Sequence, residues 1–387
     1  MLYCAMGYSE DAHVAANVNT RYALGYYGYP VDRSMARPLS LATDPAEYQR
    51  AVNRHDNKGF TEIARRYLYF SRQRERLEDL RPWLPYIQTH SNLYLTNPPE
   101  WWDEDELREP TSAEFRYQCN IALAFGADGA VLYSFVSSPA QESADPFWPP
   151  SSNAWEGDPD REIDEDCGVL GFLDRDLAPR NIDWNGEPKF DLAAAFINGY
   201  LMPVGNLMKE ENLEWKRGRI WHLRNHQGVD AGENQWVSQV LSFHMNHPTE
   251  IIDSSVQSYV LVSEFEKTST NERYLYVVNG RTHREEGDRH IAVLLGTMGG
   301  AVTHWEVHNL ITKDTWIIRA IDTDDSTNVR GRGFTDYFRA GEGALYRIKP
   351  TSAYWSDPLG LLIPGNLFVS EQATLELDGT SLTFRPG

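Results

Sequence analysis

The stretch REPTSAEFRYQCNIALAFGADGAVLYSF, at residues 108–135, decides the fold that the sequence predicts. Thr111 and Glu114 have the capping-box spacing, in which a hydroxyl and a carboxylate each bind a free backbone N–H at the start of a helix. Gly126 is expected to end this helix. Residues 129–133 are then a short, continuous apolar run, as in parallel strands that are covered on both faces. A helix followed by such a strand is one unit of an α/β domain.

The composition limits the possible partners. A formal net charge of -20 disfavours nucleic acid and anionic membranes as partners, because both require a basic surface. No segment has the length of a membrane span, and the first residues lack the pattern of a signal peptide. The 387 residues exceed what one hydrophobic core usually serves, so at least two domains are expected.

The aromatic content favours a carbohydrate partner. Aromatic residues make up 12% of the chain, including 12 Trp and 20 Tyr, and rings with a polar edge suit sugars, which present C–H patches and hydroxyls together. The alternative interpretation is that most of these rings fill the core. The three cysteines have no disulfide or zinc spacing, so neither a cofactor nor a metal is predicted. Residues 322–328 are rich in Asp, but an acidic turn is a better interpretation than a calcium loop.

Several elements surround the opening stretch. Residues 60–80 predict an amphipathic helix, and residues 81–92 predict a strand with Gln88 and His90 on one face. These two side chains could recognise sugar hydroxyls or only satisfy loop backbone groups. Residues 97–109 predict a loop, and residues 136–190 form a long irregular segment of the kind that is usually functional or disordered.

The second half of the chain changes character. Residues 191–208 predict a helix that Pro203 kinks or breaks. From about residue 213 the apolar period becomes two, which predicts an antiparallel β-sandwich. The strands are expected at residues 239–244, 258–265, 273–279, 290–295, 302–307, 315–320 and 344–348.

Motifs in this sequence resemble those of one family. The pattern R-x-P-T-x-x-E-x-R-x-Q followed by A-L-x-x-G-A-x-G, and the phrase DWNGEP at residues 183–188, resemble the C-terminal part of (β/α)8-barrel glycoside hydrolases that carry a β-sandwich domain. The resemblance implies an α/β plus all-β chain with a partial (β/α)8 barrel at 1–210 and a β-sandwich at 211–350. Residues 351–387 resemble a linker and the first coil of a right-handed β-helix.

The same resemblance implies the function. The chain is expected to act on or bind a poly- or oligosaccharide, as a fragment that lacks part of the catalytic apparatus. Tyr27 stands where the family often has an Asp, and no catalytic carboxylate pair is identified. The alternatives are a non-catalytic carbohydrate-binding or cell-surface attachment protein, and a structural scaffold. An extracellular or cell-surface location is implied by the resemblance only, and the oligomeric state is not predicted. The expected sugar contacts are Gln88, His90, Trp101, Trp102, Arg108, Tyr133, Trp148 and Trp155.

Overall fold

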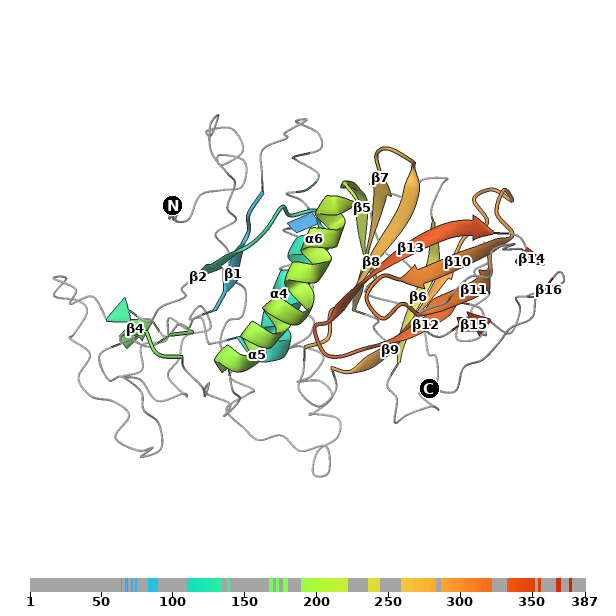
Figure 1. The fold of residues 1–387 in the computed structure, drawn as a ribbon. Helices are drawn as coiled ribbons and strands as arrows, with labels where there is room; N and C mark the ends of the chain where they lie inside the picture. The colour runs from blue at the N-terminus through green and yellow to red at the C-terminus, as the bar shows by residue number, and fades with distance from the viewer. Residues whose placement is uncertain are drawn as a thin grey trace, which may run out of the picture. The chain divides into compact units, whose positions relative to one another are not determined.

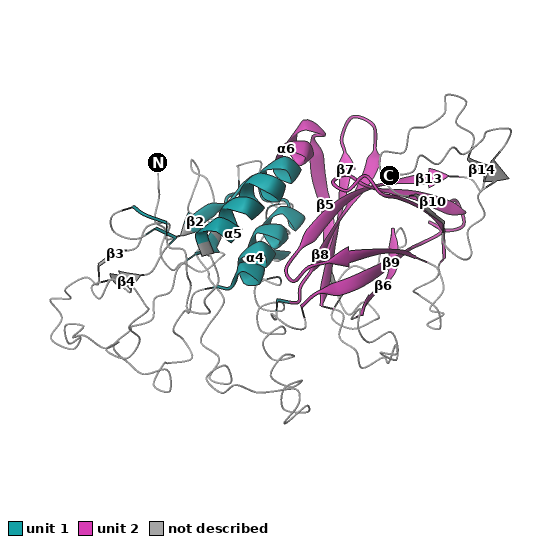
Figure 2. Ribbon diagram, turned by 60° about the horizontal axis from the view of Figure 1, so that its bottom comes forward, with its two compact units in different colours: residues 1–205, 282–284 teal, residues 206–281, 285–387 magenta. Residues whose placement is uncertain are grey.

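The structure is a computed structural model, and it describes part of the chain (Figure 1). The chain folds into two compact units, which Figure 2 colours separately. The first unit contains residues 1–205 and 282–284, and the second contains residues 206–281 and 285–387. The described residues are 64, 67–68, 71, 74, 83–89, 110–133, 138–139, 167–169, 172–173, 177–179, 189–221, 236–243, 259–282, 287–321, 333–351, 354–355, 367–369 and 376–377.

The first unit contains a β–α–β arrangement. Strand β1 (Tyr86–Gln88) is followed by helix α4 (Ser112–Ala124) and strand β2 (Val131–Tyr133). The two strands pair in parallel with each other, as the sequence predicts. Among the described residues these are the only strands of their sheet, so no (β/α)8 barrel is formed there.

Both ends of α4 are capped as the sequence predicts. Thr111 Oγ1 accepts from Glu114 N at 3.2 Å, and Glu114 Oε2 accepts from Thr111 N at 2.8 Å, so the capping box is complete. At the other end Gly126 has a φ of 79°. Its N–H donates to Leu123 O, and Ala127 N donates to Ala122 O, both at 3.0 Å, which is a Schellman motif. Glycine suits this position because it adopts positive φ without steric cost.

The helix predicted at residues 191–208 is present, and it contains an irregular turn. Helix α5 (Lys189–Phe196) continues through the π-helical segment η4 (Ile197–Leu201) into α6 (Met202–Glu210). Pro203 has no N–H to donate, and its ring would clash with the carbonyl four residues earlier in a regular helix. The π-helical turn therefore lies where the sequence predicts a kink or break.

Among its described residues, the long segment at residues 136–190 contains a short antiparallel pair, β3 (Ser138–Pro139) with β4 (Cys167–Val169), and an antiparallel bridge between Leu173 and Pro179.

The second unit consists mainly of antiparallel strands in two sheets. The larger sheet has the order β15-β11-β10-β13-β8-β7-β5, and the smaller has the order β12-β9-β6. All pairings in these two sheets are antiparallel except that of β11 with β15. The strands are β5 (Leu213–Trp221), β6 (Val237–Phe243), β7 (Val260–Lys267), β8 (Glu272–Asn279), β9 (Arg289–Leu295), β10 (His304–Asn309), β11 (Thr315–Arg319), β12 (Phe334–Phe338), β13 (Gly343–Thr351) and β15 (Leu367–Val369).

One hydrophobic core serves both sheets, as expected for a β-sandwich. Val262 and Val277 from the larger sheet pack in the same cluster as Val240 and Val293 from the smaller sheet. Trp305 on β10 is fully buried in this cluster, and its Nε1 donates to Gly296 O at 2.9 Å. The ring nitrogen therefore keeps a hydrogen-bond partner in the core, as buried indoles usually do.

Residues 351–387 contain three short described strands. β15 extends the larger sheet by pairing with β11, while β14 (Tyr354–Trp355) and β16 (Glu376–Leu377) form a separate parallel pair. A β-helix coil therefore stays a prediction, and the part of this segment that pairs with β11 belongs to the larger sheet.

Candidate functional site

Two of the expected sugar contacts lie side by side in the first unit. Gln88 is the last residue of β1, Tyr133 is the last residue of β2, and the two are in register. Because the strands are parallel, both positions lie at the carboxyl edge of the pair. In α/β folds ligands bind outside the carboxyl ends of parallel strands. An amide and a phenol also supply the donors and acceptors that sugar hydroxyls need.

Hydrogen bonds hold the two strands in this register. Val131 N donates to Pro85 O, and Asp128 N donates to Trp83 O, each at 2.9 Å. The carboxylate of Asp128 in turn accepts from Trp83 N at 2.7 Å. The turn between α4 and β2 is therefore bound directly to the start of β1.

A predicted helix supports the same turn. The described residues of the 60–80 segment are helical, and Tyr67 and Ser71 are buried. Ser71 Oγ donates to Phe125 O at 2.8 Å, and Arg74 forms an ion pair with Asp128 at 3.5 Å. Arg74 thus contributes to the α4–β2 turn.

The other expected contacts are not brought together by the described structure. His90, Trp101, Trp102, Arg108, Trp148 and Trp155 lie outside the described residues, as do Tyr27 and the acidic turn at 322–328.

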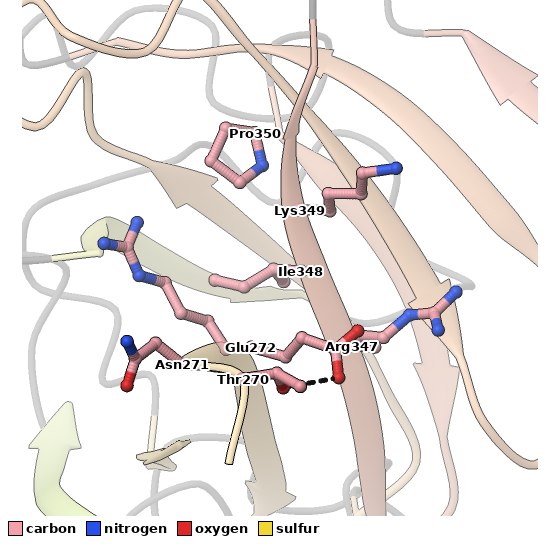
Figure 3. A pocket seen from close by; sticks show the side chains of 8 residues that line it. Thr270, Asn271, Glu272, Arg347, Ile348, Lys349 and Pro350 are labelled. Atoms are coloured by element: carbon pink, nitrogen blue, oxygen red, sulfur yellow. Dashed lines mark hydrogen bonds between the residues drawn. The ribbon is translucent and has the colours of Figure 1, made fainter. Parts of the chain in front are cut away.

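A second candidate lies in the β-rich unit, where a hollow of about 370 Å³ opens beside the β7–β8 turn (Figure 3). The hollow forms because β13 runs past the start of β8. The last registered pair is Arg273 with Ile348, so residues 349–351 have no partner on β8. Its lining residues are Thr270, Asn271, Glu272, Arg273, Arg347, Ile348, Lys349 and Pro350.

The charged side chains of this lining do not all share one face, because Arg273 is in register with Ile348 while Arg347 and Lys349 occupy the alternate positions of β13. Arg347 and Lys349 extend to the same side of β13 (Figure 3), as residues two apart on a strand should. The guanidinium of Arg273 lies 5.1 Å from the ring centre of Trp236 and 5.9 Å from that of Trp305, within the range of cation–π contacts. Glu272 is the one carboxylate among the described residues of the lining, and its Oε2 accepts from Thr270 Oγ1 at 2.9 Å.

Ionisable groups beside the hollow form a hydrogen-bonded cluster. A hydrogen bond from Lys267 lowers the pKa of Glu211, and the same bond raises the pKa of Lys267. Tyr274, whose hydroxyl donates to Glu211 at 3.4 Å, has its pKa raised to about 12, first by burial and then by the charges of Glu211 and Glu272. This arrangement stabilises a carboxylate–ammonium pair, and none of these three groups is poised to act as a general acid or base near neutral pH.

His308 is a partly buried histidine on β10. It is in register with Arg347 on β13, and its Nδ1 lies 3.0 Å from Thr315 Oγ1. Burial lowers the pKa of His308, and the charges of Arg347 and Lys313 lower it further. The imidazole is therefore biased toward its neutral form.

The hollow is not among the sites predicted from the sequence. Arg273 and Arg347 are far apart in the chain and become neighbours only when β8 pairs with β13. The phrase RIKP at residues 347–350 places two cations on one strand face in a very acidic chain, but nothing in it indicates the β7–β8 turn.

The described part of the chain also bears on metal and membrane binding. No group of three His, Cys, Asp or Glu side chains in these residues could hold a metal ion. The helices described here include none that is both long and apolar enough to cross a bilayer.

Comparisons of the chain with protein-family models, with curated proteins and with solved structures find no match.

Proposed function

We propose that this chain is a glycoside hydrolase-like protein that binds a poly- or oligosaccharide at the carboxyl edge of β1 and β2. One observation carries the proposal: Gln88 and Tyr133 end two parallel strands and are in register. Registered positions on neighbouring strands lie on one face of the pair. The phenol ring would then stack on the sugar while the amide and hydroxyl bind its hydroxyl groups.

The remaining expected contacts would extend this site. We propose that His90, Trp101, Trp102, Arg108, Trp148 and Trp155 line the same face, on the loops that follow the strands. In this proposal β1–α4–β2 belongs to a partial (β/α)8 barrel, which places these loops at the mouth. The resemblance described above and the parallel pairing support this assignment. It also implies an extracellular or cell-surface location.

Hydrolysis requires more than binding. Glycosidases use two carboxyl groups on either side of the scissile bond, and neither β1 nor β2 contributes one at its last residue. The second candidate function is therefore a non-catalytic carbohydrate-binding or surface-attachment protein that uses the same edge.

A glycan array with the purified full chain tests the proposal. Gln88→Leu and Tyr133→Phe each remove hydrogen-bonding groups with little change in size, and each should weaken binding about tenfold, which corresponds to about 1.4 kcal/mol. Tyr337→Phe, on an exposed tyrosine of β12 that donates to Asp288 at 2.7 Å, is the matched control and should leave binding unchanged.

The array has two contradicting outcomes. The proposal fails if no glycan binds, and it fails equally if Gln88→Leu and Tyr133→Phe bind as well as the unmodified chain. Assay of reducing ends on the bound glycan then separates the two candidates, because the attachment protein leaves the glycan intact.

A further inference from the structure

The helix that runs through α5, η4 and α6 (Figure 1) leaves one of its faces exposed. Its exposed residues recur every three or four positions, so they form one stripe along the helix, which we call the α5–α6 stripe. The spacing stays regular across the π-helical segment. The exposed residues are Asp191, Leu192, Ala195, Asn198, Gly199, Met202, Pro203, Asn206, Lys209 and Glu210.

The opposite face of this helix is already packed. Val204 is fully buried, and the ring of Phe196 meets that of Phe115 on α4 edge-on, with 6.2 Å between the ring centres. On the α5–α6 stripe, by contrast, Leu192 is 37% exposed and Met202 is 53% exposed. Large apolar side chains that recur in water along one helix face are typical of a surface that another helix covers.

The middle of the α5–α6 stripe allows a second helix to approach closely. Gly199 lies in the π-helical segment, and a Cβ added to it would meet no atom within 4 Å. Ala195 is about one turn before it and Met202 about one turn after it. Packed helices lie about 8–10 Å apart, depending on the side chains at their contact, and small residues permit the shorter distance.

The charges at the two ends of the α5–α6 stripe are complementary. Lys209 follows Asp191 by 18 positions, which is about five turns at 3.6 residues per turn, so both lie on the same edge of the stripe. Within the described residues neither side chain forms an ion pair. When two identical helices pair antiparallel about a two-fold axis, residues of one edge meet from opposite ends. An axis at the level of Tyr200 brings each Asp191 to the Lys209 of the other copy.

From this geometry we propose that the α5–α6 stripe is the contact between two copies of this chain, which pair antiparallel. A second copy fits because the stripe is complementary to itself. Asp191 meets Lys209 twice, and Met202 of each copy lies at about the level of Gly199 in the other. A helix over residues 189–210 is about 33 Å long, and its contact with one other helix buries less than the about 800 Å² per partner of a standard interface. The dimer is therefore weak and depends on concentration.

Sedimentation equilibrium of the full chain across micromolar concentrations tests the proposal. We expect a reversible equilibrium between monomer and dimer. Met202→Gln should weaken dimerisation about tenfold, because each dimer loses two apolar side chains from its interface. Leu177→Gln is the matched control, since it replaces another exposed apolar side chain outside the helix, and it should leave dimerisation unchanged.

Exchange of the end charges tests the antiparallel arrangement. Asp191→Lys and Lys209→Asp should each weaken the dimer about threefold or more, because each brings like charges together at both ends of the contact. Asp191→Lys/Lys209→Asp should restore dimerisation, since opposite charges face each other again. Thermal melts of the three variants show whether each is folded, which matters because the reversed charges oppose the helix dipole.

Three results would overturn the proposal. The first is a full chain that stays monomeric at every concentration. The second is dimerisation by Met202→Gln as tight as that of the unmodified chain. The third is a charge exchange that does not recover what the single reversals lose. None of these results involves Gln88 or Tyr133, so dimerisation and saccharide binding can fail separately.

Discussion

The two units differ in how their described parts are held. The β-rich unit is built from long ladders whose partners are distant in sequence, around a core that includes Trp305, Val277 and Val293. The β1–α4–β2 region has strands of only three residues and a helix that is buried along almost its whole length, and contacts such as those of Thr111 and Asp128 fix its cap and its turn. Both regions are thus stabilised by burial, but one has long strand ladders and the other has a short strand pair with added polar contacts.

The largest expected effect on stability comes from the hydrophobic core that the two sheets of the β-rich unit share. Trp305→Ala should destabilise the β-rich unit by about 3–5 kcal/mol, because it leaves a cavity and removes the partner of Gly296 O. Urea unfolding followed by far-UV circular dichroism measures the change. Trp305→Phe, which keeps a ring, should cost less. A loss below about 1 kcal/mol for the alanine variant would mean that this core does not stabilise the unit.

Glycine substitutions compare the packing of the β-rich unit with that of helix α6. A Cβ at Gly333 would clash with the backbone carbonyl of Val293, so Gly333→Ala should cost about 1–3 kcal/mol. At Gly205 in α6 there is open space, so Gly205→Ala should stabilise by about 0.5–1 kcal/mol through helix propensity. Denaturation midpoints of the two variants should shift in opposite directions. Shifts of the same sign would contradict the close packing of β12 on β9.

Loss of the α4 cap should have a smaller effect. Thr111→Ala removes the hydroxyl that accepts from Glu114 N and should destabilise α4 by about 0.5–2 kcal/mol. Hydrogen exchange at the first turn of α4 should accelerate, while Thr111→Ser should restore protection. Unchanged exchange in the alanine variant would show that tertiary packing, and not the cap, holds this helix end.

The smallest expected effect is on the pKa of His308. Arg347→Gln should raise the pKa of His308, because one of the charges that lower it is removed. A folded-state pKa below the unfolded value of about 6.5 makes the protein less stable as pH falls below that value. The variant should therefore lose less stability between pH 7 and pH 5. NMR titration of His308 checks the shift, and a lowered or unchanged pKa would contradict the assigned role of Arg347.

The elements predicted best are those whose signals are local. The capping box of Thr111 and Glu114, the end of α4 at Gly126 and the irregular turn before Pro203 each depend on the chemistry of a few adjacent residues. Most strands of the β-rich unit were also predicted to within about two residues, since one face of each is buried and the alternation is regular.

The strands that were not predicted from the sequence have broken alternation. In β5 the register shifts between Trp215 and Arg217, so an apolar side chain does not recur at every second position. In β12 only the first and last residues, Phe334 and Phe338, are buried. The pairing of β15 with β11 is long-range and parallel, which no local pattern could indicate.

The two candidate sites also differ in whether the sequence could predict them. Gln88 and Tyr133 could be proposed because each ends a recognisable strand, and the structure places them in register. The hollow could not be proposed from the sequence, because it exists only where β13 runs past β8. Its cations, Arg347 and Lys349, have no sequence motif that links them to the β7–β8 turn.

Hydrogen exchange of the full chain with and without a glycan selected on the array tests saccharide binding at the β1–β2 edge most directly. We expect slower exchange at residues 83–89 and 129–133 when the glycan is neutral, with no change in β8 or β13. Protection confined to the β-rich unit, or no protection at the carboxyl ends of β1 and β2, would contradict saccharide binding at this edge.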